Sequence, residues 1–352
     1  MTSIAKPPVR HPGLLKNALG LTKRDYEGAM STLCAGCGHD SVTTALISAC
    51  WEMDLPPHRA AKMSGIGCSS KTTAYFMKQS HGFNTVHGRM PSVATGANAA
   101  NRSLTYIGIS GDGDSLSIGL GQLCHAIRRN VRLLYVLENN GVYGLTKGQF
   151  SASADLGSTA KRGEANLQPP IDPVLLALSL GATFVARSFS GDKTELVPIL
   201  KAGLAHNGFA LIDVISPCVS FNDHEGSTKS YLYTREHSEE VAPVDFVPLR
   251  REITATTTDE GGAMSVTMHD GSTVRFRSVK EGYDPTDRDA AYAYVRGAQR
   301  RGEIATGLLY IDERGSDMHA VNKTVQTPLV DLPFEALCPG GQALDTLMDE
   351  FR

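Results

Sequence analysis

TYIGISGDGDSLSIGLGQLCHAIRRNVRLLYVLENNGVYGLTKGQ, residues 105–149, is the stretch that decides the fold. Its pattern predicts an apolar strand over 105–110, a helix over 116–129 and a second apolar strand over 131–137. A Gly-Asp-Gly turn follows the first strand, and two asparagines follow the second. This order predicts a right-handed crossover between parallel strands, whose C-terminal ends then lie at the same edge of the sheet.

Asp112 and Asn140 follow the two strands, so we expect them to converge at that edge. A carboxylate and an amide oxygen, with a nearby backbone carbonyl, make half of an octahedral Mg²⁺ site that a ligand's phosphates would complete. An EF-hand loop is excluded because its later ligands and its glutamate are missing. A Walker A loop is excluded because Lys147 is not preceded by glycine in the required frame. A plain surface turn is the alternative, and the strand–helix–strand context favours a diphosphate cofactor held through a metal.

The composition is that of an ordinary globular protein. The 352 residues allow one large α/β domain or two smaller ones, with 41% hydrophobic and 20% charged residues. A net charge of -3 gives no reason to expect nucleic acid or an anionic membrane as partner. The first residues lack the apolar core of a signal peptide, and the longest apolar stretch, 173–186, is too short to span a bilayer. We therefore expect a cytoplasmic protein.

Seven cysteines fall into two groups by their neighbours. Cys50 and Cys124 lie in apolar helical segments and are interpreted as small core side chains. Cys338, in a late Pro-Gly loop, is uninformative. The remaining four stand among Gly, Ser or Pro and are the candidates for a site: Cys34, Cys37, Cys68 and Cys218.

The spacing of these four cysteines suggests a metal centre. Cys34 and Cys37 form a C-x-x-C pair, which lets two thiolates reach one centre from a tight turn. Cys68 follows a Gly-Ile-Gly turn after a segment interpreted as helical, and Cys218 follows the apolar strand 210–215; both positions suit the ligand-binding edge. Four thiolates suit tetrahedral zinc or a [4Fe–4S] cluster. A structural zinc usually takes two close pairs, so one pair with two distant cysteines favours a cluster beside another cofactor. A thioredoxin-type pair would need a βαβ unit around it.

The span from Gly111 to Asn140 resembles the thiamine diphosphate signature, GDG followed after a fixed interval by NN. In families with this signature the Asp, the second Asn and a backbone oxygen two residues later bind Mg²⁺. The resemblance therefore assigns Mg²⁺ to Asp112, Asn140 and the carbonyl of Val142.

Over most of its length the chain resembles the β subunit of 2-oxoacid:ferredoxin oxidoreductases. The resemblance implies a thiamine diphosphate-binding α/β fold, with a mostly parallel sheet flanked by helices. It also implies that the four cysteines hold one [4Fe–4S] cluster near the thiamine. A separate α subunit would supply much of the remaining active site, including the activating glutamate, for which we assign no residue here. The matching pieces are CAGCGH (34–39), GIGCSS (65–70), HGR (87–89), VATGANAAN (93–101) and GDGD to LTKGQ (111–149).

The same resemblance assigns contacts around the cofactor. For the carboxylate of the 2-oxo acid, Lys71 is the first candidate and Arg89 of the HGR motif the second, against the alternative of a solvated surface charge. His87 would donate a hydrogen bond to phosphate or substrate, unless it is structural. Residues expected to border the diphosphate or thiazolium are Gly113, Asp114, Gly144 and Leu145, and those expected on the other side are Ile66, Gly67 and Ser69 beside Cys68.

The activity implied is coenzyme A-dependent oxidative decarboxylation of a 2-oxo acid, with two one-electron transfers through the cluster to ferredoxin. An αβ or α2β2 assembly is expected. Segment 218–237 and the long C-terminal region resemble the 2-oxoglutarate branch, while pyruvate and branched-chain substrates stay open. The alternatives are a thiamine-dependent decarboxylase or carboligase without electron transfer, and a protein whose cysteines hold structural zinc.

We expect two parts: a thiamine diphosphate- and cluster-binding domain over 1–250 and a C-terminal extension over 251–352. In the extension, 253–280 predicts a β-hairpin with Asp270-Gly271 between its strands. A helix over 288–301 and a strand over 307–313 should follow. The proline-punctuated tail is interpreted as an arm that embraces a partner, or else packs on its own domain.

Overall fold

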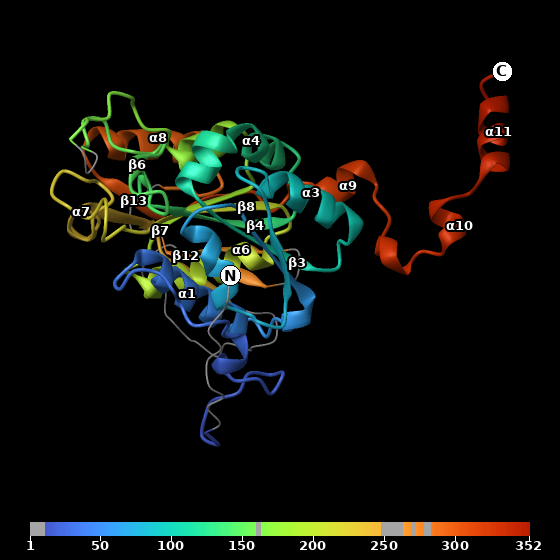
Figure 1. The fold of residues 1–352 in the computed structure, drawn as a ribbon, viewed down its shortest axis with the longest axis horizontal. Coiled ribbons are helices and arrows are strands. Elements are labelled where there is room, and N and C mark those ends of the chain that lie inside the picture. Colours follow the sequence, from blue (N-terminus) through green and yellow to red (C-terminus); the bar gives the residue numbers. More distant parts are fainter. Residues whose placement is uncertain (1–10, 160–162, 248–262, 269–271, 278–282) are drawn as a thin grey trace.

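A mostly parallel eight-stranded sheet organises the molecule (Figure 1). The structure is a computed structural model that describes residues 11–159, 163–247, 263–268, 272–277 and 283–352. All neighbours from β2 to β7 pair in parallel, whereas β13 is antiparallel to β7 and parallel to β9. This confirms the predicted α/β class. The strand order is β2 (His81–Asn84), β1 (Ala60–Ser64), β3 (Thr105–Gly111), β4 (Leu133–Asn139), β8 (Phe209–Ile215), β7 (Phe184–Phe189), β13 (Ile304–Ile311) and β9 (Ser238–Ala242).

Helices cover both faces of this sheet. Side chains alternate between the faces along each strand, so Leu134 and Val136 join one core cluster while Leu133 and Tyr135 join the other. Burial on both faces explains the almost continuous apolar runs of the central strands. One face carries α1 (Gly38–Glu52) and α6 (Lys193–Ala205), and the other carries α3 (Met90–Ala100), α4 (Leu120–Arg128), α5 (Pro173–Ser179) and α8 (Arg288–Arg300).

The predicted βαβ unit is present, with shifted boundaries. β3 runs to Gly111, and β4 begins and ends two residues later than expected. The helix starts at once after Asp112 as a π-helical turn, η4 (Gly113–Ile118), before α4. Gly111 pairs with Glu138, so the GDG turn lies beside the two asparagines as expected.

The segment before Cys68 was predicted wrongly. It is strand β1 and not a helix. All five of its residues are buried between β2 and β3, so sheet pairing and burial override the helical preference of the AAKMS sequence. Cys68 therefore follows the C-terminal end of a strand, as Cys218 follows β8. Short helices η3 (Ser69–Lys71) and α2 (Thr72–Tyr75) continue the chain.

The C-terminal extension contains the expected hairpin, helix and strand. β11 (Ala263–Thr267) pairs antiparallel with β12 (Thr273–Arg277), and β10 (Val244–Val247) adds a third strand; Asp270-Gly271 lies outside the described residues. Helix α8 packs against α5, and β13 joins the main sheet. The main sheet thus draws strands from both sides of the boundary at residue 250, and the division into two domains stays a prediction.

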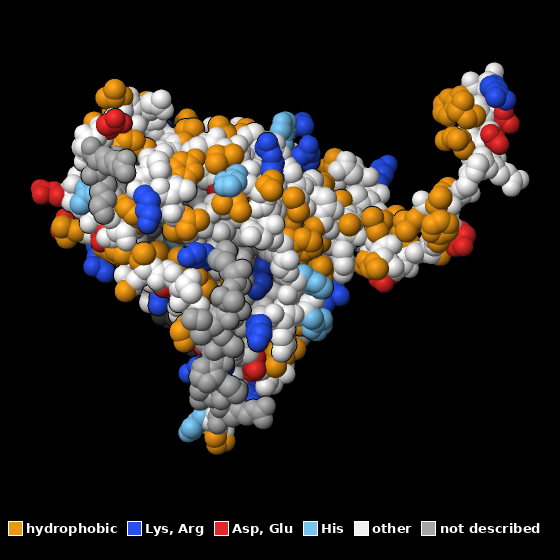
Figure 2. All heavy atoms as spheres, viewed as in Figure 1, with side chains coloured by type: hydrophobic (Ala, Val, Ile, Leu, Met, Phe, Trp, Pro, Cys, Tyr) orange, Lys and Arg blue, Asp and Glu red, His pale blue; other side chains and the backbone are white. Residues whose placement is uncertain are grey.

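The chain ends in an arm, residues 323–352, that leaves the body after α9 (Met318–Asn322) (Figure 1). It contains η5 (Leu329–Asp331), α10 (Phe334–Leu337) and α11 (Gly341–Asp349), none of which has a buried residue. Packing on its own domain, one of the two expectations for the tail, is therefore not what the structure shows. Apolar side chains are visible along the arm in Figure 2. Among the described helices, none has the length and apolar character needed to cross a bilayer.

The remaining short elements connect these layers. They are η1 (Lys23–Tyr26), η2 (Pro57–Arg59), α7 (Tyr231–His237) and a two-stranded sheet of β5 (Val142–Tyr143) and β6 (Gln149–Phe150).

Candidate functional site

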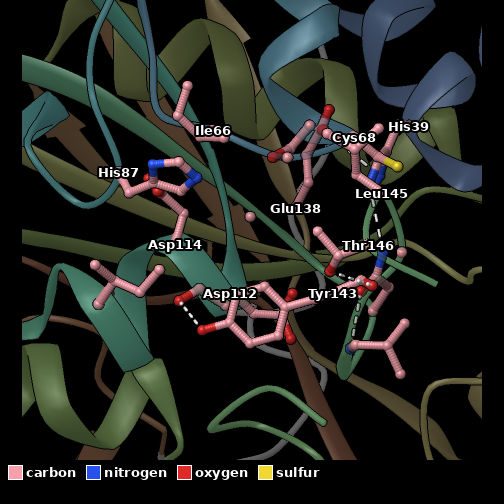
Figure 3. A pocket seen from close by; sticks show the side chains of 18 residues that line it. His39, Ile66, Cys68, His87, Asp112, Asp114, Glu138, Tyr143, Leu145 and Thr146 are labelled. Carbon is pink, nitrogen blue, oxygen red and sulfur yellow. Dashed lines mark hydrogen bonds and ion pairs between the residues drawn. The ribbon is translucent and has the colours of Figure 1, made fainter. Parts of the chain in front are cut away.

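A cavity of about 580 Å³ opens at the C-terminal edge of β1, β3 and β4 (Figure 3). This is the edge at which α/β sheets bind ligands. The loops after all three strands contribute to its wall. The expected site residues that line it are Ile66, Gly67, Cys68, Ser69, His87, Asp112, Gly113, Asp114, Asn140, Val142, Gly144 and Leu145.

Oxygen donors suited to a hard cation meet on one side of this cavity. Asp112 and Asn140 are 1% and 5% exposed. The Asn140 Oδ1 accepts a hydrogen bond from the Val142 N–H at 3.0 Å, which folds the chain back and brings the 142 backbone beside Asn140. A carboxylate, an amide oxygen and a backbone carbonyl are the donor types that Mg²⁺ takes in proteins. The chemistry of this donor set therefore fits a magnesium ion.

Two glycines shape the wall for a close-fitting ligand. A Cβ at Gly113 would come within 2.4 Å of the Tyr143 ring, whose hydroxyl donates to the Gly113 carbonyl at 2.9 Å. A Cβ at Gly144 would lie 3.5 Å from the sulfur of Cys68 and 3.6 Å from that of Cys218. Gly144 thus brings the backbone of the cavity wall directly against two of the candidate sulfur ligands.

Asp114 lines the cavity, but both of its carboxylate oxygens accept hydrogen bonds from neighbouring parts of the protein. Its Oδ1 accepts from the Gly88 N–H at 2.7 Å and its Oδ2 from the Ser110 hydroxyl at 2.9 Å. These bonds hold the turn that carries His87 against β3. His87 is exposed and lies beside Ile66 and Asp114 in Figure 3.

The four candidate cysteines gather next to this cavity. Cys37 is buried, Cys68 and Cys218 are half-buried, and Cys34 is exposed. Burial raises the pKa of Cys68, and the thiolate charges of Cys218 and Cys34 raise it further. Burial raises the pKa of Cys37 to about 12, with a smaller contribution from Cys218. The mutual influence of the four on their pKa values means that they occupy one neighbourhood.

The arrangement of the thiols bears on the choice of metal. Within the described ranges, no three or more His, Cys, Asp or Glu side chains form a group that could hold a metal ion. A single zinc would need all four sulfurs about 2.3 Å from one point. A cubane cluster spaces its thiolates more widely, because each binds a different iron. The all-sulfur donor set beside the cavity is of the kind that a [4Fe–4S] cluster or a zinc ion takes.

Glu138 was not expected at the site. It is fully buried in β4, lines the cavity and accepts a hydrogen bond from the Thr72 hydroxyl at 3.0 Å. Burial raises the pKa of Glu138 well above its usual value. Its only sequence signal is a charged residue inside the apolar run LLYVLEN, whose position on the cavity side required the sheet to be known.

His39 lies beside Glu138 and is also buried. Its Nδ1 is 2.6 Å from the Ser216 hydroxyl and 3.5 Å from the Glu138 carboxylate. Burial lowers the pKa of His39 to about 4, so the ring is neutral near pH 7 and its contact with Glu138 is not an ion pair. The hydrogen bond to Ser216 ties the start of α1, just after Cys37, to the end of β8.

The two candidate cations, Lys71 and Arg89, differ in their exposure and in their position relative to the cysteines. Lys71 is half-buried in the turn after Cys68, and its backbone N–H donates to the Cys68 carbonyl at 3.1 Å. The charge of Lys71 lowers the pKa of the Cys68 thiol and so opposes the larger effect of burial. Arg89 is exposed and caps α3. The described cavity wall includes His87 but neither Lys71 nor Arg89.

Comparison with known proteins gives consistent matches. Residues 65–214 match the family model of the thiamine pyrophosphate enzyme, C-terminal TPP binding domain. The chain is similar to the 2-oxoacid:ferredoxin oxidoreductase subunit beta of Saccharolobus solfataricus, with 43% identity over 203 residues, 57% of this chain and 66% of the relative. It is 38% identical to the 2-oxoglutarate oxidoreductase subunit KorB of Mycobacterium tuberculosis over 220 residues, 60% of this chain and 58% of the relative. The matches therefore span less than two thirds of these two relatives.

Two further matches cover more of the protein compared. The 2-oxoglutarate synthase subunit KorB of Methanocaldococcus jannaschii is 34% identical over 189 residues, 53% of this chain and 69% of that subunit. Among solved structures, a chain of the 2-oxoglutarate:ferredoxin oxidoreductase from Magnetococcus marinus, with 2-oxoglutarate, coenzyme A and succinyl-CoA bound, superimposes with a TM-score of 0.70. That match has 29% identity and covers 89% of this chain and 91% of the other.

Proposed function

Because this chain belongs to the family of 2-oxoacid:ferredoxin oxidoreductase β subunits, we propose that it works with an α subunit in the oxidative decarboxylation of a 2-oxo acid. The reaction joins the acyl group to coenzyme A, releases CO₂ and passes two electrons to ferredoxin. The observation that carries the proposal is the juxtaposition at one sheet edge of an oxygen donor set and four thiols. A thiamine-dependent decarboxylase or carboligase with structural zinc would use the thiols only to hold the fold, with no electron transfer.

The oxygen donors would hold thiamine diphosphate through Mg²⁺. Asp112, Asn140 and the Val142 carbonyl are the proposed metal ligands, and Gly113 lets the diphosphate approach the backbone. Thiamine diphosphate, when bound, supplies the electron sink that makes decarboxylation feasible. The chain's own contribution would be to anchor the phosphates through these metal ligands and to let them approach the backbone at Gly113, which lines the cavity. The TPP-binding family match over 65–214 supports this assignment.

The thiols of Cys34, Cys37, Cys68 and Cys218 are the proposed ligands of a [4Fe–4S] cluster. The cluster, when bound, accepts electrons one at a time. Burial favours the protonated thiols in the metal-free chain, since it raises the pKa of Cys37, Cys68 and Cys218. Binding of iron would therefore release protons. Gly144, which lies against two of the sulfurs, keeps the path between the two cofactors free of a side chain.

Substrate contacts are proposed for cationic and polar groups on the same edge. Lys71 is the first candidate for the substrate carboxylate because it lies one turn after Cys68, and Arg89 is the second, although neither lies in the described cavity wall. His87 in the wall would donate a hydrogen bond to phosphate or substrate. We propose 2-oxoglutarate as the substrate and succinyl-CoA as the product, supported by the names of the KorB relatives and the ligands of the Magnetococcus marinus structure.

The α subunit is proposed to cover the exposed parts of the site and the C-terminal arm. Val86 and Ile118, near the cavity mouth, are 69% and 46% exposed. In the arm, Val330 and Phe334 are 86% and 72% exposed. A partner subunit would remove these apolar surfaces from water, in an αβ or α2β2 assembly.

Metal analysis tests this function directly. The chain should be purified anaerobically with its α subunit, and iron, zinc and sulfide measured on one sample. We expect about four iron and four sulfide per αβ unit, and bleaching of the cluster absorbance when 2-oxoglutarate and coenzyme A are added. Cys218→Ser should lose iron, whereas Cys124→Ser, a half-buried cysteine outside the group, should keep it. Zinc without sulfide would contradict the electron-transfer function.

A further inference from the structure

The carboxylate of Asp112 is held unequally through its two oxygens. Its Oδ2 accepts hydrogen bonds from the Gly141 N–H at 2.9 Å, from the Ser153 hydroxyl at 2.6 Å and from the Ser151 hydroxyl. Within the described ranges, no hydrogen bond engages Oδ1. Asp112, Ser151 and Ser153 are 1%, 6% and 2% exposed, so water does not compete for these bonds. We call the two serines with the Gly141 N–H the Asp112 clamp.

The clamp comes from the loop that returns after Asn140. β5 and β6 pair antiparallel, and the Ser151 N–H then donates to the Gly141 carbonyl at 3.2 Å. The Ala154 N–H donates to the Ser151 carbonyl at 3.1 Å, and the turn that this bond closes brings both serine hydroxyls to Asp112. Between them, the Ala152 N–H donates to the Ser117 hydroxyl at 3.0 Å and fixes the segment on η4.

A buried polar network holds the clamp from behind. Ser153 Oγ also lies 2.8 Å from the Asn139 Oδ1. The Asn139 amide donates to Asp213 at 3.0 Å, and Asp213 in turn pairs with the guanidinium of Arg187 at 2.8 Å. Each member is under 9% exposed, so the Ser153 oxygen is held in place between Asp112 Oδ2 and Asn139 Oδ1, which share its one hydroxyl proton. Such buried, connected networks keep a single geometry.

We propose that the Asp112 clamp makes this aspartate a monodentate metal ligand and thereby selects Mg²⁺ over Ca²⁺. The Gly141 N–H and the two serine hydroxyls surround Oδ2, so only Oδ1 is open to a cation. Mg²⁺ requires near-ideal octahedral geometry and is satisfied by one oxygen per carboxylate, whereas Ca²⁺ takes more ligands and readily binds carboxylates through both oxygens. Ser151 and Ser153 are positioning residues, because they act on the metal only through Asp112. The inference rests on the proposed function.

Metal titrations on the full chain, purified with its partner subunit and stripped of divalent ions, test the clamp. With thiamine diphosphate in excess, the Kd values of Mg²⁺ and Ca²⁺ are measured separately by calorimetry. For Ser151→Ala and Ser153→Ala we expect the Mg²⁺ Kd to rise about 10- to 100-fold, the usual effect of removing a partner of a metal ligand. The Ca²⁺ Kd should change less, so that the preference for Mg²⁺ falls at least about tenfold.

Two further variants control this experiment. Ser151→Thr keeps the hydroxyl and should keep the preference for Mg²⁺. Ser158→Ala removes a hydroxyl on the same loop that donates to the Asp155 carbonyl at 2.7 Å, away from Asp112, and should leave both Kd values unchanged. If a serine-to-alanine variant fails to fold, as shown by circular dichroism, the remaining alanine variant and Ser151→Thr carry the test.

The possible outcomes separate the clamp from the function on which it rests. Suppose that the unsubstituted protein binds Mg²⁺ normally. If the alanine variants then weaken the binding of both ions equally, or weaken neither, the clamp alone is overturned. If the unsubstituted protein shows no divalent-dependent binding of thiamine diphosphate, the proposed cofactor site fails and the clamp fails with it.

Discussion

At the scale of single residues, burial changes the protonation of groups outside the cofactor site. Glu195 near the start of α6 accepts hydrogen bonds from the Thr306 hydroxyl at 3.0 Å and the Gly307 N–H at 3.3 Å, both on β13. Burial of its carboxylate, with the nearby charges of Glu240 and Asp192, raises the pKa of Glu195 to about 7. This group therefore links α6 to the strand contributed by the C-terminal extension in a pH-dependent way.

Glu195→Gln should stabilise the protein at alkaline pH only. A raised carboxyl pKa means that the folded state binds the proton more tightly, so stability is lost as the pH rises from about 4.5 through about 7. Glutamine avoids this loss, worth up to about 3 kcal/mol at about 1.4 kcal/mol per pKa unit. Thermal unfolding at pH 5 and pH 8 measures it, with the exposed Glu236→Gln as control. An equal gain at both pH values would contradict the prediction.

At the scale of elements, one buried lysine holds the helix that follows Cys68. Lys62 on β1 is 6% exposed, and its ammonium donates to the carbonyls of Thr73, Phe76 and Met77 at 2.7, 2.5 and 3.0 Å. Burial lowers the pKa of Lys62 to about 8, and three carbonyl acceptors favour the charged form at neutral pH. The strand thereby fixes the C-terminal end of α2, and with it the turn that carries Cys68 and Lys71.

Lys62→Met should destabilise the protein and loosen the Cys68 turn. Methionine has similar length, but it leaves three buried carbonyls without a donor, which we expect to cost about 2 kcal/mol or more. The melting temperature and the iron content of the anaerobically purified complex should both fall. Lys78→Met, at an exposed position in the following turn, serves as the control. A variant as stable as the parent would show that the three carbonyls find other donors.

At the scale of the whole molecule, the helices of the arm, residues 323–352, contribute no buried residue to the core of the body. The last helix, α11, and the residues after it expose Leu344, Leu347, Met348 and Phe351, at 59%, 51%, 51% and 83%. Their spacing places them on one face of a helix. A helix of 9 residues is marginally stable alone in water, so this apolar face is expected to be stabilised by docking.

Removal of residues 325–352, which leaves the hydrogen bonds of Thr324 to the buried His319 in place, should weaken assembly without destabilising the body. No arm residue in α10 or α11 is buried, so the melting temperature of the truncated chain should match that of the full chain. Co-purification with the α subunit should fall at least severalfold, because the apolar face no longer contributes. Leu344→Asp with Leu347→Asp should reproduce the loss, and Thr346→Asp, on the polar face, should not. Unchanged co-purification would assign the arm to another partner.

Local patterns determined the parts of this protein that depend on neighbours in sequence. Strand, helix and strand periods over 105–137 predicted the βαβ unit, and parallel pairing then required Asp112 and Asn140 to meet at one edge. Spacing and turn chemistry also predicted the hairpin of β11 and β12 and the helix α8. Of the four cysteines, each could be recognised by its Gly-, Ser- or Pro-rich setting, because close backbone approach needs such residues.

Only the tertiary structure decided which distant groups share a buried environment. The segment of β1 is a strand because it pairs with two neighbouring strands that bury it. Glu138 is part of the cavity wall because side chains alternate in direction along β4 and this one points to the cavity. The clamp serines and Lys62 had no sequence signal, since a hydroxyl or an ammonium gains its role from partners that sheet pairing brings together. Sequence determines periodicity and local turns. The partners of a buried polar group depend on packing between segments far apart in the chain, which no local pattern encodes.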